Sequence, residues 1–188
     1  MDTSLSIIKK TLKDIRVSLS SEFDKNFERQ GFFTTAWPRL KSPARQGGHI
    51  LVDKGNLRRS IVAHSDDNSI TFSSDLPQAA IHNEGGKIKV TAKMKKYFWH
   101  RYYETIGGFG RKKNGEKRND KKNVRLTEMA EFYQHMALMK VGSEITIPKR
   151  QFLGTSPELE QKVTDIIQKN LEEFFNNNVD KIRKKYDK

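Results

Sequence analysis

Residues 157–183 read PELEQKVTDIIQKNLEEFFNNNVDKIR, and this stretch decides the fold. Its large apolar residues recur every three or four positions, the spacing that places side chains on one face of an α-helix. They are Leu159, Val163, Ile166, Ile167, Leu171, Phe174, Phe175, Val179 and Ile182. Ser156 suits the N-cap, Pro157 suits the first helical position, and acidic residues follow in the first turn. The stretch therefore predicts a long amphipathic helix.

A second long helix is predicted over residues 4–29, where Leu5, Ile8, Leu12, Ile15, Leu19, Phe23 and Phe27 repeat the same spacing. Between the two helices, a strand near residues 57–64 and an alternating strand at 70–73 flank a turn at 66–68, which indicates a hairpin. Residues 143–147 alternate again and end at Pro148. The predicted fold class is therefore α+β: a small antiparallel or mixed β-sheet packed against two long terminal helices, with a long basic insertion.

Shorter helices are predicted inside the insertion and just before it. Residues 77–82 form a short helix that Gly85-Gly86 ends, and residues 91–106 and 127–140 form two longer ones. The methionine and aromatic residues of 127–140 suit a core or a subunit interface better than a cofactor site.

Positive charge is concentrated in one segment. The 188 residues include 36 Lys and Arg against 23 Asp and Glu, a formal net charge of +13. Fourteen of those basic residues and three of the acidic ones lie between Gly85 and Arg125, which puts +11 into 41 residues. We predict one α+β domain, residues 1–86 and 141–188, and a basic, partly mobile insertion, residues 87–140, with one or two helices. The centre of the insertion, residues 107–123, has almost no apolar residue, which predicts a mobile loop.

Several functional classes are disfavoured by the composition. The chain has no cysteine, which excludes a disulfide framework, a cysteine-ligated zinc site, an iron–sulfur cluster and a thiol nucleophile. The longest apolar run, Met136–Met139, is far too short to cross a membrane. The first ten residues, MDTSLSIIKK, do not have the pattern of a secretory signal.

No catalytic constellation is visible, so we expect a protein that is not an enzyme and has no cofactor or metal. The five histidines have no i, i+4 pair, and no phosphate-binding or nucleophile motif occurs. His82 precedes Asn83 and Glu84, which leaves a metal or nuclease site as a minor alternative. A lone histidine at the end of a short helix more often bonds to a neighbouring carbonyl.

The basic segment is the strongest functional signal. Lysine and arginine interleaved with aromatic residues suit phosphate contacts and base stacking. A solvated loop whose aromatic residues pack on a partner subunit explains the composition equally well. The candidate contacts with DNA or an acidic partner are Lys93, Lys95, Lys96, Arg101, Arg111, Lys112, Lys113, Lys117 and Arg118.

Four segments stand in a recognisable order: residues 37–40 (WPRL), 50–61 (ILVDKGNLRRSI), 79–86 (AAIHNEGG) and 147–154 (IPKRQFLG). Together they resemble the phage virion-morphogenesis, or tail-completion, family, whose pattern is roughly W-x-P-L, I-L-x-x-x-G-x-L-x-x-S-I, Y-A-x-I-H-x-x-G and I-P-x-R-x-F-L-G. The resemblance covers about residues 30–86 and 141–185. Two positions depart from the pattern, since Trp37 directly precedes Pro38 and Ala79 replaces the usual tyrosine.

The resemblance implies a non-enzymatic assembly protein of a tailed phage or prophage, which completes the tail or joins it to the head by ring formation and loop docking. Related neck and tail-terminator proteins form rings, often hexameric. The implied partners are further copies of the chain, the tail tube and head-connector proteins, with nonspecific DNA contact and no membrane. The implied location is the host cytoplasm during assembly and then the virion. A nucleic-acid-binding protein that uses residues 87–125 is the alternative.

The motif residues are assigned structural or interface roles. They are Trp37, Gly55, Leu57, Arg58, Ile81, His82, Gly85, Gly86, Pro148, Arg150 and Phe152. The large apolar ones are expected in the core, and Gly55 is expected to allow a tight turn. Arg150 is expected to pair with an acidic residue, either across a subunit boundary or as an ordinary surface ion pair.

Overall fold

The computed structural model describes residues 3–40, 42–43 and 48–186, with side chains described from residue 6 to residue 179 of these ranges. The chain divides into two compact units. Unit 1 comprises residues 1–37, 51–79 and 150–188, and unit 2 comprises residues 38–50 and 80–149. Unit 2 contains 19 Lys and Arg against seven Asp and Glu, a net +12, so unit 1 has only +1.

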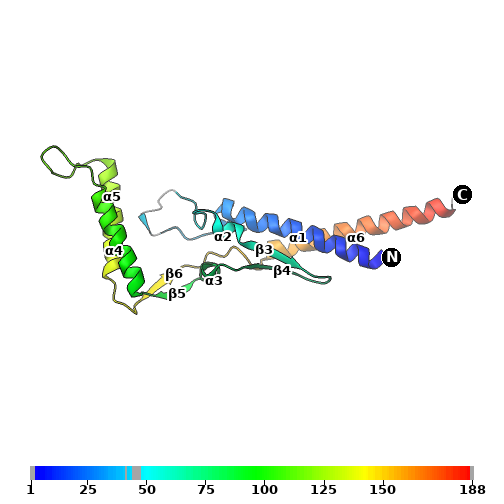
Figure 1. Ribbon diagram of the computed structural model, residues 1–188. Coiled ribbons are helices and arrows are strands. Elements are labelled where there is room, and N and C mark those ends of the chain that lie inside the picture. The colour runs from blue at the N-terminus through cyan, green and yellow to red at the C-terminus, as the bar shows by residue number, and fades with distance from the viewer. Residues whose placement is uncertain (1–2, 41, 44–47, 187–188) are drawn as a thin grey trace. The chain divides into compact units, whose positions relative to one another are not determined.

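Unit 1 is built on two long antiparallel helices, α1 (Thr3–Arg29) and α6 (Pro157–Tyr186), which confirms the two predicted helices (Figure 1). Polar contacts set their register: Lys162 bonds to Glu22 at 2.8 Å, and Asn170 bonds to Asp14 at 3.0 Å. The N-terminus of α6 is capped by Ser156, whose hydroxyl accepts a hydrogen bond from the Leu159 amide. The side chains of Leu5 and Ile182 lie outside the described part of the apolar stripes.

The strands of unit 1 form two small antiparallel pairs. β1 (Gly31–Phe32) pairs with β2 (Thr35–Ala36), and β3 (Ile61–Ser65) pairs with β4 (Ile70–Ser74) in the predicted hairpin. Asp66 holds the β3–β4 turn by accepting hydrogen bonds from the amides of Asn68 and Ser69.

The prediction of a strand starting at Leu57 is wrong. Gly55, at φ 74°, turns the chain into a one-turn helix, α2 (Asn56–Arg59), and the strand begins only at Ile61. The Ser60 amide and hydroxyl both bond back to the Leu57 carbonyl, which closes this turn. Leu57 is therefore buried as part of a helical turn. A single apolar residue in a short run is compatible with either a strand or a helical turn, so the sequence pattern does not separate the two.

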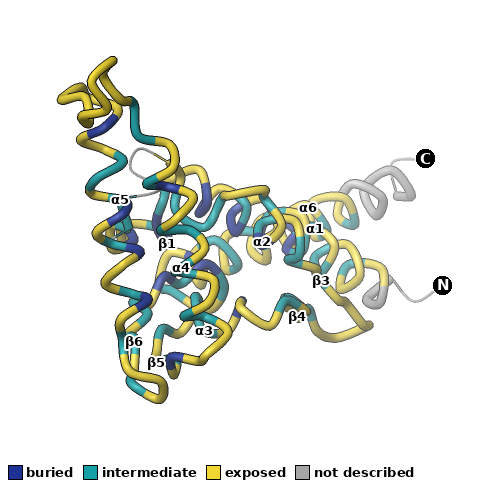
Figure 2. The backbone as a smooth tube through the Cα atoms, turned by 60° about the vertical axis from the view of Figure 1, so that its left-hand side comes forward, coloured by how far each residue is buried: buried dark blue, intermediate teal, exposed yellow. Residues whose placement is uncertain are grey.

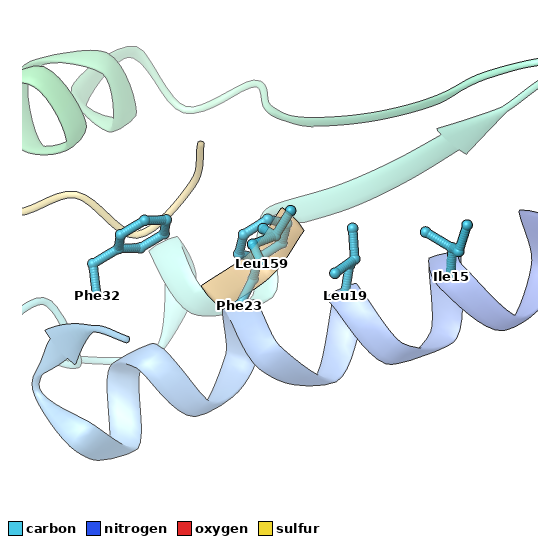
Figure 3. Packing of buried hydrophobic residues seen from close by; sticks show 5 residues of the cluster. All are labelled: Ile15, Leu19, Phe23, Phe32 and Leu159. Carbon is cyan, nitrogen blue, oxygen red and sulfur yellow. The ribbon is translucent and has the colours of Figure 1, made fainter. Parts of the chain in front are cut away.

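The core of unit 1 lies between the helices and the hairpin (Figure 3). Its buried members are Ile15, Leu19 and Phe23 of α1 with Phe32 and Leu159. Phe72 of β4 meets Phe23 edge to face, with ring centroids 4.9 Å apart. The outer face of the hairpin, in contrast, is exposed.

Unit 2 holds a helix pair and one further strand pair. α3 (Pro77–Glu84) runs from unit 1 into unit 2 and leads to β5 (Gly86–Lys89), which pairs antiparallel with β6 (Glu144–Ile147). Between these strands lie α4 (Ala92–Gly107) and α5 (Lys121–Leu138). The α+β class is confirmed, but the described strands form three separate two-stranded sheets instead of one. α5 begins six residues earlier than predicted because Asp120 caps it by accepting the Asn123 amide.

Candidate interaction surface on a basic helical hairpin

The two helices of unit 2 pack antiparallel, as a helical hairpin. Phe98 of α4 faces Tyr133 of α5, and Arg101 lies over the Tyr133 ring at 5.6 Å from its centroid. The contact with Tyr133 raises the pKa of Arg101. Ala130 and Ala137 are buried, and their small side chains allow α4 and α5 to approach closely. The α4–α5 pair thus has a compact seam and exposed outer faces (Figure 2).

Asn123 organises the loop at the end of this hairpin. Its side chain is buried; its oxygen accepts from the Gly110 amide at 2.8 Å, and its nitrogen donates to the Gly110 and Arg118 carbonyls at 2.8 and 2.7 Å. Arg111 and Lys117 form an antiparallel bridge just beyond it. The segment therefore has a hydrogen-bonded conformation, and its mobility in solution stays a prediction. The sequence shows Asn123 only as a polar residue in a charged run, so its role was missed.

Each acidic residue of the basic segment is already engaged within the chain. Glu104 pairs with Arg101 at 2.5 Å, and Glu116 pairs with Lys112 at 3.1 Å. Asp120 is the cap of α5. No acid in this segment remains for the other cations. Lys87 pairs with Glu144 of β6 at 2.8 Å, outside the segment, and the exposed lysines without such a partner are left to solvent ions or to another molecule.

The structure separates the nine predicted contact residues into two groups. Those with intramolecular partners are Arg101, Arg111, Lys112, Lys117 and Arg118. Within the loop, Arg111 donates to the Gly115 carbonyl, Arg118 donates to the Arg111 carbonyl, and Lys117 lies 4.2 Å from the Phe109 ring centroid. Among the described residues, the side chains of Lys93, Lys95, Lys96 and Lys113 have no such partner. These four lysines are the better candidates for contacts with another molecule.

Aromatic side chains line the flank of α4 that carries Lys95 and Lys96. Trp99 stacks on Tyr103, with ring centroids 5.8 Å apart, and Tyr102 meets both rings edge to face. Tyr103 is 61% exposed. At 100° per residue, Lys95, Trp99 and Tyr103 follow one another at i, i+4 and i+8 on the helix. The flank therefore combines flat aromatic surface with unpaired positive charge.

The first and last motif segments meet inside unit 1. Trp37 is buried, meets Phe27 edge to face at 5.5 Å and donates its indole N–H to the Gln151 carbonyl at 2.6 Å. Phe152, 1% exposed, also packs against Phe27, with ring centroids 5.5 Å apart. Asn26 joins the same contact, donating to the Phe152 carbonyl at 3.3 Å and accepting from the Phe33 amide. These motif residues therefore hold the chain together.

The charged motif residues are also structural. Arg58 forms a bidentate pair with Asp24 and reaches Glu28 at 2.8 Å, which joins α2 to α1. The hydrogen bonds from Arg58 lower the pKa of Asp24. Arg150 is 5% exposed, so the expectation of an ordinary surface ion pair is wrong, and burial lowers the pKa of its guanidinium.

The remaining motif residues lie on α3 or at the ends of the strand pair β5–β6. Gly85 has φ 72°, and a Cβ there would lie 2.7 Å from the Lys149 amide nitrogen, next to the Pro148 that follows β6. Gly86 has φ 143° and faces Ile81. Ile81 and His82 are half-buried on α3. The glycines thus permit a close backbone approach that a side chain would block.

No metal centre is apparent in the part of the chain that the structure describes. No three His, Asp or Glu residues are grouped there as metal ligands would be, and this includes the surroundings of His82. Among the same residues, none of the helices is long and apolar enough to cross a membrane.

Comparison with known proteins identifies the family. The profile of the phage virion morphogenesis family matches residues 5–172, which is most of the chain. The chain belongs to this family. The match begins within α1 and ends within α6, so it includes all of unit 2 and most of unit 1. Membership places the chain among proteins of phage virion morphogenesis.

A relative supports the assignment. The Mu-like prophage FluMu G protein 2 of Haemophilus influenzae is 38% identical over 76 residues, which cover 40% of this chain and 51% of the relative. The chain thus spans about half the length of this curated relative. No solved structure matches the chain.

Proposed function

We propose that the protein is a structural assembly component that completes the phage tail or joins it to the head, without catalysing a reaction. The observation that carries this proposal is the family match over residues 5–172. Several copies form a ring at the tail end, and the protein acts in the host cytoplasm before it becomes part of the virion. The basic hairpin of unit 2 then docks to an acidic surface of a neighbouring virion protein or faces the DNA channel.

The charge distribution supports a docking role for the hairpin. Unit 2 has a net +12, and the acids between Gly85 and Arg125 are already paired or used in a cap. Lys93, Lys96 and Lys113 are exposed and lack partners among the described residues. Such charges steer association and specify orientation more than they hold a complex together, which suits late attachment to a large particle.

Deletion and complementation in the phage or prophage that carries the gene test the role. Without the protein, electron microscopy is expected to show separate heads and tails, or tails of uncontrolled end structure, and the wild-type gene is expected to restore complete virions. Normal virions in the deletion strain would refute the proposal.

Charge-neutralising variants test the docking hairpin separately. Replacing Lys93, Lys96 and Lys113 by glutamine is expected to reduce virion yield while the protein still folds. The matched control replaces Lys13, Lys54 and Lys169, three exposed lysines of unit 1, by glutamine. Equal yields from the two triple variants would show that the hairpin is not the docking element.

The alternative, a nucleic-acid-binding protein, is favoured by one observation, the stacked Trp99 and Tyr103 beside Lys95 and Lys96. In that case, phosphate contacts provide most of the affinity and aromatic rings stack on bases. A titration with single- and double-stranded DNA, followed by tryptophan fluorescence, distinguishes the two functions. Channel contact predicts weak binding that disappears by roughly 200 mM salt, whereas tight binding that stays selective above that concentration favours the alternative.

A further inference from the structure

The apolar stripe of α6 is divided between two flanks of the helix. Leu159, Val163 and Ile166 turn toward the core that α1 completes. A second set lies at a regular spacing of four residues and remains in solvent: Ile167, Leu171, Phe175 and Val179, which are 39%, 41%, 61% and 45% exposed. We call these four residues the α6 ridge. Four large apolar side chains exposed in sequence along one helix are more than isolated surface residues.

The surroundings of the α6 ridge carry little charge. At 100° per residue, the polar neighbours on the same flank are Thr164, Gln168 and Asn178. Glu172 lies at one edge of the ridge, next to Val179. The other charged residues of this part of α6, Asp165, Lys169 and Glu173, are turned further away from it. In a chain that is 31% charged, a flank of about four turns with one bordering charge is suited to contact with another apolar surface.

The charge of the chain indicates what that surface is. A contact between the unit 2 of one copy and the unit 2 of another would bring a net charge of +12 against +12. Unit 1 has a net charge of only +1, so a contact between two copies of unit 1 meets little repulsion. An i, i+4 ridge is also the feature that packs into the matching groove of another helix when both helices present such ridges. The α6 ridge of a second copy meets both conditions.

The exposed apolar area of the α6 ridge is large enough to form the centre of an interface between two proteins. Side chains of about 150–200 Å² each, exposed to these fractions, leave roughly 350 Å² of apolar surface on each copy. Two copies would remove roughly 700 Å² from water at the centre of a contact, and polar rim residues would extend it toward the roughly 1,200–2,000 Å² of a specific interface.

We infer that the α6 ridge binds the same ridge of a second copy of this chain, in a twofold contact between antiparallel α6 helices. The contact covers Leu171 and Phe175 near its axis and leaves the basic hairpin of each copy free for other partners. It goes beyond the proposed tail role and does not depend on it.

The mass of the purified full-length protein in solution tests the inference. Light scattering across a dilution series is expected to give twice the 21.8 kDa chain mass for the wild type and a single chain mass for Phe175→Asp. Asn176→Asp is the matched control, because it adds the same charge to the neighbouring exposed position on the other side of α6 and should remain paired. Circular dichroism of each variant checks that the helices are retained.

Cysteine cross-linking tests the geometry. The chain has no cysteine, so a single introduced one reports only its own contact. Leu171→Cys is expected to form a disulfide-linked pair on mild oxidation, and Lys169→Cys, an exposed position on the side of α6 away from the ridge, is expected to stay a single chain. A wild type of single-chain mass, a Phe175→Asp variant with the wild-type mass, or equal cross-linking at positions 171 and 169 would each overturn the inference.

Discussion

Replacing Glu22 by glutamine is expected to remove a pH-dependent part of the stability of unit 1. Glu22 lies on α1, and its side chain is only 9% exposed. Burial by itself would raise the pKa of this carboxyl, but hydrogen bonds from Lys162, Arg29 and Lys25 outweigh that effect and lower the pKa to about 2. Lys162 belongs to α6, so the cluster also ties the two long helices together.

The size of the effect follows from the lowered pKa. An unfolded glutamate titrates near 4.3, so the folded state favours the charged form by a little over two pK units, or about 3 kcal/mol at most. Because the folded pKa is the lower one, this stabilisation is complete above about pH 4.5 and is lost as the pH falls through about 2. In a chain of this length, 3 kcal/mol corresponds to a Tm difference of about 6–12 °C.

Urea unfolding followed by circular dichroism between pH 5 and pH 2 measures the effect. The wild type is expected to lose more free energy of unfolding over this range than Glu22→Gln, by about 3 kcal/mol. Glu172→Gln, an exposed carboxyl on α6, is the matched control and should follow the wild type. Parallel pH profiles for the wild type and Glu22→Gln would refute the assignment of the three-cation cluster.

Three further substitutions probe other parts of the fold. Gly85→Ala is expected to weaken the pairing of β5 with β6, because the new Cβ would lie 2.7 Å from the Lys149 backbone. Faster amide hydrogen exchange in both strands would show the effect. Gly107→Ala is the control, because a Cβ there would have no atom within 4 Å, and it should leave the exchange rates unchanged. Asn123→Ala is expected to expose the loop to trypsin at least tenfold faster, since it removes three hydrogen bonds that close the loop, and an unchanged cleavage rate would argue against that role. Phe152→Ala is expected to lower the free energy of unfolding by about 3–5 kcal/mol in urea titrations, and a loss below about 1 kcal/mol would contradict its place in the core.

Some features of the protein are encoded locally, and the sequence was sufficient for them. The two long helices follow from apolar residues spaced every three or four positions, which depends only on the geometry of one helix. The β3–β4 hairpin follows from alternation around a turn whose Asp66 bonds to its own neighbours. The concentration of charge in one segment is a property of composition, and the four motif segments already resembled the family to which the chain belongs.

Other features depend on contacts between distant residues, and only the tertiary structure decided them. Leu57 lies on a helical turn because Gly55 and Ser60 shape the backbone around it, which hydrophobicity alone does not reveal. The structure shows that Glu104 pairs with Arg101 and Glu116 pairs with Lys112. Only these pairings separate the cations that are engaged within the chain from the lysines that are available to a partner. The nine apolar residues of α6 read as one stripe in the sequence, whereas packing against α1 buries one flank and leaves the other exposed. The physical reason is that the periodicity of a sequence shows which side of a helix or strand is apolar, whereas burial depends on which other element packs against that side.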